Sequence, residues 1–217
     1  VEMPTSAATS PEAVARYIAA RETDPFLRVK ALYDWVADHI RYDAPALAAG
    51  EYPPQDPETV FQTRKAVCAG YAKLLERMAE TIGINMVYVT GVSRERGGNV
   101  GGNGHAWNAV EVEERWYLID ATWGAGYVEG DTFHKRYNPD YLFTPPEVLG
   151  VDHFPDESKW QLRKPPISRG EFMRQPVLRA GFFERGFECF LIHGDVGVPI
   201  CFFFNDTATT EIYTVKD

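Results

Sequence analysis

Two apolar segments rich in β-branched and aromatic residues, 105–112 and 116–121, constrain the fold more than any other part of the sequence. They are typical of an antiparallel hairpin that turns at Glu113-Glu114-Arg115. If the turn holds two residues, paired positions sum to an odd number, and Asp120 lies opposite or diagonal to His105 on one face. A turn with an odd number of residues would place the carboxylate on the other face. The sequence therefore predicts a His–Asp contact that depends on one turn.

A helix is predicted over residues 68–82, and it begins at Cys68. A single cysteine is usually a small buried hydrophobe, but this one lies where the free N–H groups and the helix dipole stabilise a thiolate. Arg64 and Lys65 are expected to add positive charge nearby. Gly70 has a lower helix propensity than Ala by roughly 1 kcal/mol, which indicates a steric need. Cys68 is therefore a candidate nucleophile with a lowered pKa.

Cys68, His105 and Asp120 together predict a nucleophile, its base and the acid that orients the base, as in a catalytic triad. Metal binding is the competing chemistry, but separations of 37 and 15 residues match no compact metal motif. We therefore expect neither a metal nor a cofactor. The other histidines are interpreted as core or surface residues, because no partner is visible for His39, His134, His153 and His193.

Turn and breaker residues divide the rest of the chain. Two helices separated by Asp24-Pro25 are expected between residues 11 and 41, the first capped by Ser10. An irregular connection is expected over 44–57, a strand over 84–92, a glycine-rich loop over 94–104 and a short extended piece over 141–143. Residues 154–176 are proline-rich, with anchors expected at Trp160, Leu162 and Phe172. The predicted domains are a helical or linker segment (1–24), a catalytic domain (25–176) and a partial β-rich segment (177–217).

Composition excludes several classes of function. The formal net charge of −9 and the scattered basic residues argue against nucleic-acid binding. No segment approaches the ~20 apolar residues that a membrane-spanning helix needs. Three cysteines give no disulfide framework and no CxxC pair, although Cys189 and Cys201 could pair if their strands are neighbours. The sequence does not determine the oligomeric state.

Four segments give the chain a resemblance to the transglutaminase-like superfamily, in its bacterial branch related to the kyphoscoliosis-peptidase group. The resemblance covers about residues 25–176. The matching residues are Trp35, then Thr63-Arg64-Lys65-Ala66-Val67-Cys68-Ala69-Gly70-Tyr71-Ala72, then Gly104-His105-Ala106-Trp107-Asn108-Ala109-Val110, then Trp116-Tyr117-Leu118-Ile119-Asp120-Ala121-Thr122-Trp123-Gly124.

The resemblance implies an α+β, papain-like fold, in which the helix that bears the nucleophile packs on an antiparallel β-sheet, followed by the start of a small β domain. It implies acyl transfer through a thioester on a protein or peptide amide. The Cys68 N–H would contribute to an oxyanion hole, with Gln62 as a candidate side-chain donor. Candidate residues of the substrate groove are Trp107, Trp123 and Tyr71. The family and the start of the chain favour export, as a secreted or periplasmic bacterial protein.

Several alternatives stay open at this stage. Water as acceptor gives hydrolysis and an amine gives cross-linking, and hydrolysis is favoured because no acceptor site is identifiable. The acyl donor is a glutamine side chain, a peptide bond or a wall peptide. A non-catalytic module that binds protein or glycan is the alternative function. Residues 203–214 resemble translated sequencing-adapter read-through, with an ordinary hairpin end as the other interpretation.

Overall fold

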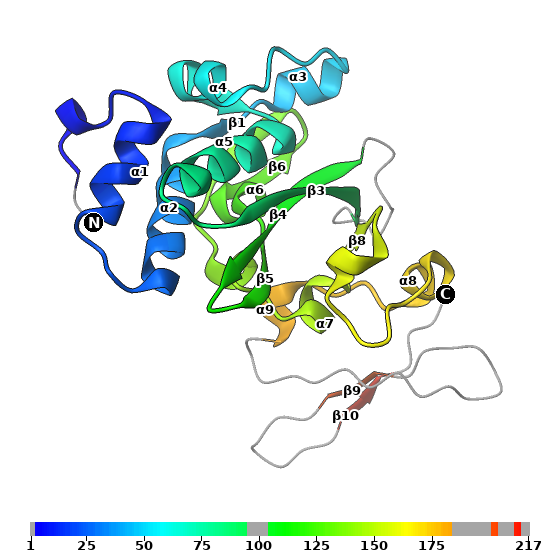
Figure 1. The fold of residues 1–217 in the computed structure, drawn as a ribbon. Helices are drawn as coiled ribbons and strands as arrows, with labels where there is room; N and C mark the ends of the chain where they lie inside the picture. Colours follow the sequence, from blue (N-terminus) through cyan, green and yellow to red (C-terminus); the bar gives the residue numbers. More distant parts are fainter. Residues whose placement is uncertain (1–2, 95–103, 184–200, 204–210, 214–217) are drawn as a thin grey trace.

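Helices form the first part of the structure. The computed structural model describes residues 3–94, 104–183, 201–203 and 211–213 (Figure 1). After a short 3-10 turn, η1 (Thr5–Ala7), come α1 (Pro11–Ala19) and α2 (Pro25–His39), both with proline in the first turn. Ser10 Oγ accepts from Ala13 N at 3.1 Å, and Asp24 Oδ1 accepts from Leu27 N at 2.9 Å. These caps confirm the two predicted helix starts.

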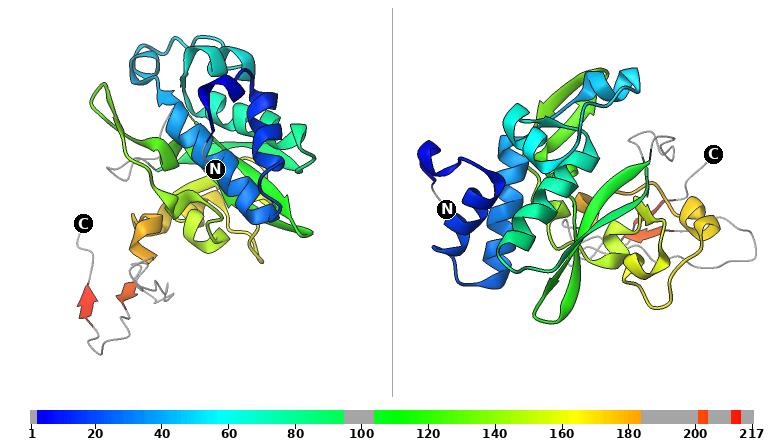
Figure 2. Two further views of the ribbon diagram at one scale, coloured as in Figure 1. Left: turned by 90° about the vertical axis from the view of Figure 1, so that its left-hand side faces the viewer. Right: turned by 45° about the horizontal axis from the view of Figure 1, so that its top comes forward.

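A four-stranded antiparallel sheet lies beneath the helices, in the order β5-β4-β3-β8. Its strands are β3 (Met86–Ser93), β4 (His105–Val112), β5 (Arg115–Ile119) and β8 (His153–Pro155). The predicted helix at Cys68 is α5 (Cys68–Thr81), and it packs on β3 and β4 (Figures 1 and 2). This arrangement confirms the α+β, papain-like prediction of a helix starting at Cys68 on an antiparallel sheet.

The hairpin register agrees with the two-residue turn. Val112 pairs with Arg115 and Asn108 with Ile119. Glu113 and Glu114 form the turn with φ of 51° and 61°, which suits the right-handed twist of the two strands. Arg115, expected in the turn, is the first residue of β5. The even turn places residues 105 and 120 diagonally on one face of the sheet.

The region expected to be irregular, 44–57, contains a helix, α3 (Ala44–Ala49), and a second one, α4 (Pro57–Thr63), follows it. The prediction was wrong because two of its prolines occupy the first turn of a helix, where a missing N–H costs nothing. Strands β1 (Arg41–Tyr42) and β2 (Lys65–Ala66) pair in parallel. They bring the end of α2 beside the start of α5.

Short elements make up the remainder of the described chain. They are α6 (Ala121–Ala125), β6 (Gly126–Glu129), β7 (Thr132–Lys135), η2 (Pro139–Tyr141), α7 (Pro146–Leu149), η3 (Ser158–Gln161), α8 (Arg169–Arg174), α9 (Ala180–Phe183), β9 (Cys201–Phe203) and β10 (Glu211–Tyr213). The extended piece expected over 141–143 is replaced by η2 and a single bridge from Thr144 to Leu118. Residues 180–183 are helical where a strand was expected, while β9 and β10 pair antiparallel. The predicted domain limits stay predictions.

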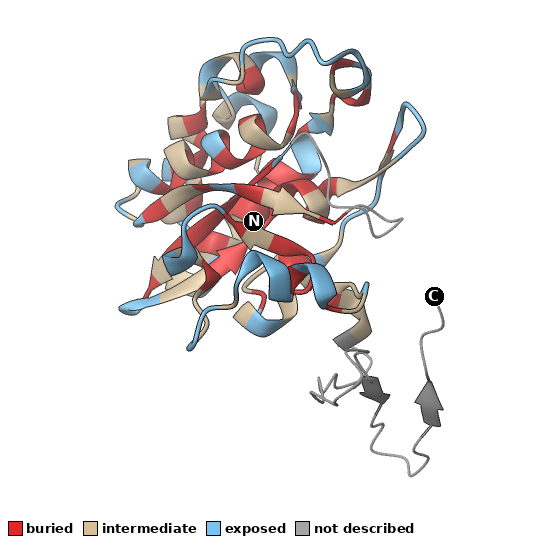
Figure 3. Ribbon diagram, turned by 90° about the vertical axis from the view of Figure 1, so that its right-hand side faces the viewer, coloured by how far each residue is buried: buried red, intermediate tan, exposed pale blue. Residues whose placement is uncertain are grey.

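Two apolar clusters lie on opposite faces of the sheet, because alternate residues of β4 belong to one or the other. Figure 3 shows how much of the chain around the sheet is buried. The larger is formed by the helices with Val110, Val112 and Ile119. The smaller contains Val89, Trp107, Ala109 and Leu118, joined by Tyr141, Leu149 and Ala180. Trp160 and Leu162 pack against the smaller cluster and Phe172 is fully buried, so these predicted anchors are confirmed. Within the described part of the chain, none of the helices is long and apolar enough to cross a membrane.

Candidate active site

Cys68 is the first residue of α5 and its side chain is partly exposed. Val67, the N-cap, provides no side-chain hydrogen bond to the helix. The N–H groups of a first helical turn have no partner within the helix, so they favour negative charge on the sulfur. Burial raises the pKa of Cys68, but hydrogen bonds from His105 and the Ala106 N–H, with the His105 charge, lower it overall. The local environment therefore favours a thiolate.

His105 and Asp120 are in direct contact, as the hairpin register predicts. His105 Nε2 lies 2.7 Å from Asp120 Oδ2, and the two side chains are almost completely buried. Because Asp120 occupies Nε2, the other ring nitrogen, Nδ1, is the one left to face the thiol. Asp120 Oδ1 accepts from the N–H groups of Thr122 and Trp123 at 2.8 and 3.1 Å. These bonds fix the carboxylate, because Asp120 is also the N-cap of α6.

The surroundings of the His105–Asp120 pair favour its ionised form. Burial alone would lower the pKa of His105, but the charge and the hydrogen bond of Asp120 raise it to about 10. Burial would raise the pKa of Asp120, yet the charges and hydrogen bonds of His105 and His153 hold it well below its usual range. An imidazolium beside a thiol is the arrangement that stabilises a thiolate near neutral pH.

Polar contacts tie α5 to its surroundings near Cys68. Asn108 Nδ2 on β4 donates to Ala72 O on α5 at 3.0 Å. Gln55 Oε1 accepts from Val67 N at 3.0 Å, directly before the cysteine. A Cβ on Gly70 would lie 2.5 Å from the same Gln55 oxygen, so the predicted steric need at Gly70 is real. Helix, sheet and preceding loop are thus held together around the thiol.

The other predicted site residues differ in burial and in their contacts. Gln62 lies exposed on α4, while it is Gln55 that contacts the start of α5. Tyr71 is fully buried and its OH donates to Ile40 O at 2.7 Å. Trp107 is 1% exposed and packs beside the His105 ring, whereas Trp123 is partly exposed. Tyr71 and Trp107 therefore have packing roles in this structure, and only Trp123 of the three reaches the surface.

The charges expected beside the thiol have other partners. The guanidinium of Arg64 lies over the rings of Phe61 and Trp35, at 4.1 and 4.9 Å from their centroids. Lys65 Nζ lies 3.9 Å from an Asp43 carboxylate oxygen. The hydrogen bond and charge of His105 and the hydrogen bond of the Ala106 N–H, rather than these two residues, account for the lowered pKa of Cys68.

Sequence reasoning missed His153, which was interpreted as a residue without a partner. Its Nε2 lies 3.1 Å from Asp120 Oδ2 and its Nδ1 lies 2.6 Å from Asp152 Oδ1. It also missed Tyr42 and Tyr88, partly exposed tyrosines whose pKa is raised by burial and by charge on Cys68. Nothing in the local sequence points to these positions, because β8, β1 and β3 reach the site only through pairing with other strands.

His105, Asp120 and His153 also form a group of the kind that can hold a metal ion, with ligand atoms within 4.8 Å of one another. The sequence interpretation did not identify this third side chain. The hydrogen bonds to Asp120 account for the proximity of all three, since both imidazole Nε2 atoms lie at bonding distance from one oxygen. Hydrogen bonds are therefore sufficient to explain why the three side chains lie together.

Comparison with known proteins agrees with this geometry. Residues 12–121 match the model of the transglutaminase-like superfamily, and the match includes the start of α5 and the β4–β5 hairpin. The kyphoscoliosis peptidases of Mus musculus and Homo sapiens are each 39% identical over 166 residues, which is 73% of this chain and 25% of each relative. The chain thus spans about a quarter of the length of these curated relatives.

A solved structure described as a TGase is 24% identical, covers 58% of this chain and 34% of that chain, and gives a TM-score of 0.42. The family match extends over half of the present sequence, and the residues that it includes form the helix-on-sheet core seen in the structure. The chain belongs to the transglutaminase-like superfamily.

Proposed function

We propose that this chain is a cysteine-dependent acyl-transfer enzyme that acts on a protein or peptide amide through a thioester intermediate. The observation that supports it most is the hydrogen-bonded series from Cys68 through His105 to Asp120 at a helix start. Support comes from the surroundings of each group, which lower the pKa of the Cys68 thiol, raise the pKa of His105 and bury the Asp120 carboxylate. The name of the kyphoscoliosis peptidases accords with this chemistry.

In the first half-reaction the Cys68 thiolate attacks the carbonyl carbon of the amide. His105 gives its proton to the nitrogen as the C–N bond breaks, so that a neutral amine leaves and a thioester remains. In the second half-reaction His105 takes a proton from water, which attacks the thioester and releases a carboxylic acid. Cys68 leaves as thiolate, and the ion pair with His105 is restored. An amine in place of water would give transamidation.

The oxyanion of each tetrahedral intermediate needs donors near the start of α5. The Cys68 N–H is our candidate donor, because first-turn N–H groups point out of the helix end. Tyr42, Tyr88 and Trp123 are candidates for contact with the substrate, because all three are partly exposed and interact with Cys68 or His105. Hydrolysis is the favoured reaction. The acyl donor is a peptide bond, a glutamine side chain or a wall peptide, and substrate assays distinguish these.

The test combines a thiol probe with two amide substrates. The 217-residue protein is treated with fluorescent iodoacetamide, then assayed for cleavage of labelled casein and for incorporation of dansylcadaverine into dimethylcasein. We expect labelling and turnover to be lost in Cys68→Ala and retained in the double variant Cys189→Ser/Cys201→Ser. Casein cleavage without amine incorporation identifies a hydrolase. Unchanged labelling of Cys68→Ala would contradict the proposal and favour the non-catalytic binding module.

A further inference from the structure

Asp120 is shared between two buried histidines. Its Oδ2 lies 2.7 Å from His105 Nε2 and 3.1 Å from His153 Nε2, while two backbone N–H groups occupy Oδ1. The Asp120 and His153 side chains are 0% and 1% exposed. A triad requires only one imidazole on its carboxylate. The second imidazole is therefore a feature that the proposed mechanism does not use.

Both ring nitrogens of His153 face carboxylate oxygens. Nε2 faces Asp120, and Nδ1 lies 2.6 Å from Asp152 Oδ1. A neutral imidazole has one N–H and one lone pair, so it would direct a lone pair at one of these two oxygens. Only the imidazolium donates to both. The surroundings of His153 therefore fit a buried cation between two buried anions, which is the pairing that makes a buried charge tolerable.

Asp152 is itself held by its neighbours. Its Oδ2 accepts from the Tyr141 OH at 3.1 Å and lies 3.4 Å from Arg179 Nη1. The Arg179 guanidinium also lies over the Trp123 ring, 4.8 Å from its centroid. Arg94, the residue after β3, also interacts electrostatically with Asp152. The charged and titratable groups that face His153 are thus Asp120, Asp152, His105 and Tyr141, with Arg179 and Arg94 behind Asp152.

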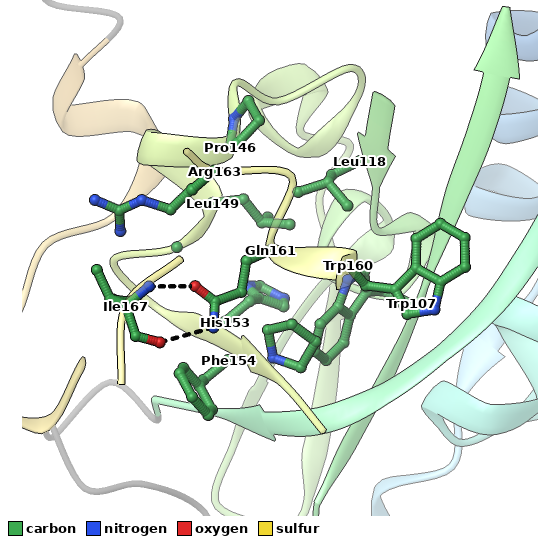
Figure 4. A pocket seen from close by; sticks show the side chains of 12 residues that line it. Trp107, Leu118, Pro146, Leu149, His153, Phe154, Trp160, Gln161, Arg163 and Ile167 are labelled. Carbon is green, nitrogen blue, oxygen red and sulfur yellow. Dashed lines mark hydrogen bonds between the residues drawn. The ribbon is translucent and has the colours of Figure 1, made fainter. Parts of the chain in front are cut away.

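Packing leaves the His153 ring little freedom. Trp123 and Trp107 lie edge-on to it, with ring centroids at 4.6 and 5.1 Å. A cavity of about 10 Å³ lies beside it, lined in part by Trp107, Trp160 and Gln161 (Figure 4). That volume is at the lower limit for a single water molecule, so the cavity admits no substrate group. The ring is confined to the orientation that both carboxylates favour.

We propose that His153 is a positioning residue: an imidazolium held by Asp152 that fixes Oδ2 of Asp120 toward His105 and offsets part of the Asp120 charge. The inference rests on the proposed function of Cys68 and His105. Two cations bound to one carboxylate compete, so the charge of His153 lowers the basicity of His105. His153 thereby sets the upper end of the pH range in which His105 stays protonated beside the thiol.

The first experiment uses a variant only to assign the signal, and its result does not depend on Cys68. Nitrogen-15 NMR of the labelled wild-type protein reports whether each imidazole nitrogen carries a proton. We expect His153, assigned by its loss in His153→Gln, to show two protonated nitrogens from pH 6 to pH 8. A His153 with one unprotonated nitrogen in this range would overturn the proposal, whatever the reactivity of the thiol.

The second experiment measures alkylation of Cys68 by iodoacetate against pH, because this anionic reagent depends on the His105 imidazolium. In His153→Gln we expect the rate at pH 7 to fall about tenfold, as for one lost buried hydrogen bond. In a plot of alkylation rate against pH, the decrease on the alkaline side should move to higher pH. Asp152→Asn, which leaves the ring in place, should move this decrease in the same direction with a smaller loss of rate.

The control is His134→Gln, since His134 is a half-exposed residue on β7 whose carboxylate partner, Glu129, lies at 3.7 Å. It should leave the profile unchanged. A lower rate in His153→Gln without any movement of the decrease on the alkaline side would assign His153 a packing role and overturn the proposal. An unchanged profile in both His153 and Asp152 variants would overturn it too. If the His153 and Asp152 variants lose alkylation while Cys68→Ala is still labelled, the alkylated residue is not Cys68. That result would count against the proposed function.

Discussion

His105 and Asp120 are not opposite each other in the hairpin but diagonal, with 2.7 Å between Nε2 and Oδ2. The strand pairing ends at Ile119, and Asp120 turns out of β5 to cap α6. One carboxylate therefore ends a strand, starts a helix and orients an imidazole. Replacing Asp120 therefore tests its three structural roles together.

Asp120→Asn should lower the rate of casein cleavage by on the order of 10³-fold to 10⁴-fold. The N–H groups of Thr122 and Trp123 require an oxygen at the Oδ1 position, so the amide nitrogen would take the place of Oδ2. His105 would then accept at Nε2 and carry its proton on Nδ1, the wrong tautomer for a base that faces the thiol. Asp131→Asn, in the exposed β6–β7 turn, is the matched control. Equal rates for the two variants would contradict the assignment.

Stability should fall on the alkaline side because of His105. Its pKa is raised from 6.5 to about 10 by Asp120, against the effect of burial, so its contribution is complete below pH 6.5 and is lost as pH rises toward 10. The pKa of Asp120 is lowered, so its contribution is present above the ordinary aspartate pKa of 3.8 and is lost as pH falls further. Urea denaturation from pH 3 to pH 10 measures both slopes.

In His105→Gln the decrease between pH 6.5 and pH 10 should be smaller than in the wild type. The protein should also be less stable than the wild type at pH 6.5, because Asp120 loses one of its two imidazole partners. A wild-type stability that is constant or rises between pH 6.5 and pH 10 would show that the pair is not ionised in the folded state.

Gln55 and Gln62 form a matched pair of variants. Gln55→Ala removes the acceptor of the Val67 N–H, and we expect a loss of about 1–3 kcal/mol in the free energy of unfolding, with slower alkylation of Cys68. Gln62 is exposed on α4, so Gln62→Ala should change the free energy of unfolding by less than about 0.5 kcal/mol. The measurement is urea denaturation combined with casein cleavage. A larger loss of cleavage in Gln62→Ala than in Gln55→Ala would restore Gln62 as the side-chain donor.

Gly91 lies where β4, β3 and β8 approach one another, paired with His105 on one side and Pro155 on the other. A Cβ there would lie 2.2 Å from Phe154 O and 2.7 Å from a carbon of the Trp107 ring. Gly91→Ala should therefore destabilise the protein by about 1–3 kcal/mol or more and displace His153 from Asp120. Gly170→Ala, in α8, would place its Cβ at ordinary contact distance, 3.5 Å from Arg174 Nη1, so this change should be neutral or stabilising. Equal melting temperatures for the two variants would contradict this packing.

Much of the site follows from local chemistry along the chain. The start of α5 at Cys68 and the strands of the hairpin are each specified by residues close in sequence. The length of the turn at Glu113-Glu114 then fixes on which face Asp120 lies, although neither glutamate favours the positive φ that this turn requires. The family motifs concern the same segments, so the fold and the contact between His105 and Asp120 were predictable. Export of the protein and its substrate stay predictions.

The residues that surround these three were decided by tertiary structure alone. His153 and Asp152 are more than thirty residues from Asp120 and reach it because the three-residue strand β8 pairs with the end of β3. Gln55 reaches Val67 across α4, and Arg179 reaches Asp152 from beyond the proline-rich segment. Such contacts are set by where strands and loops pack, which no local pattern of hydrophobicity or capping specifies. The sequence by itself determined which groups carry the proposed chemistry. Long-range packing determined which neighbours fix the orientation of these groups and shift their pKa values.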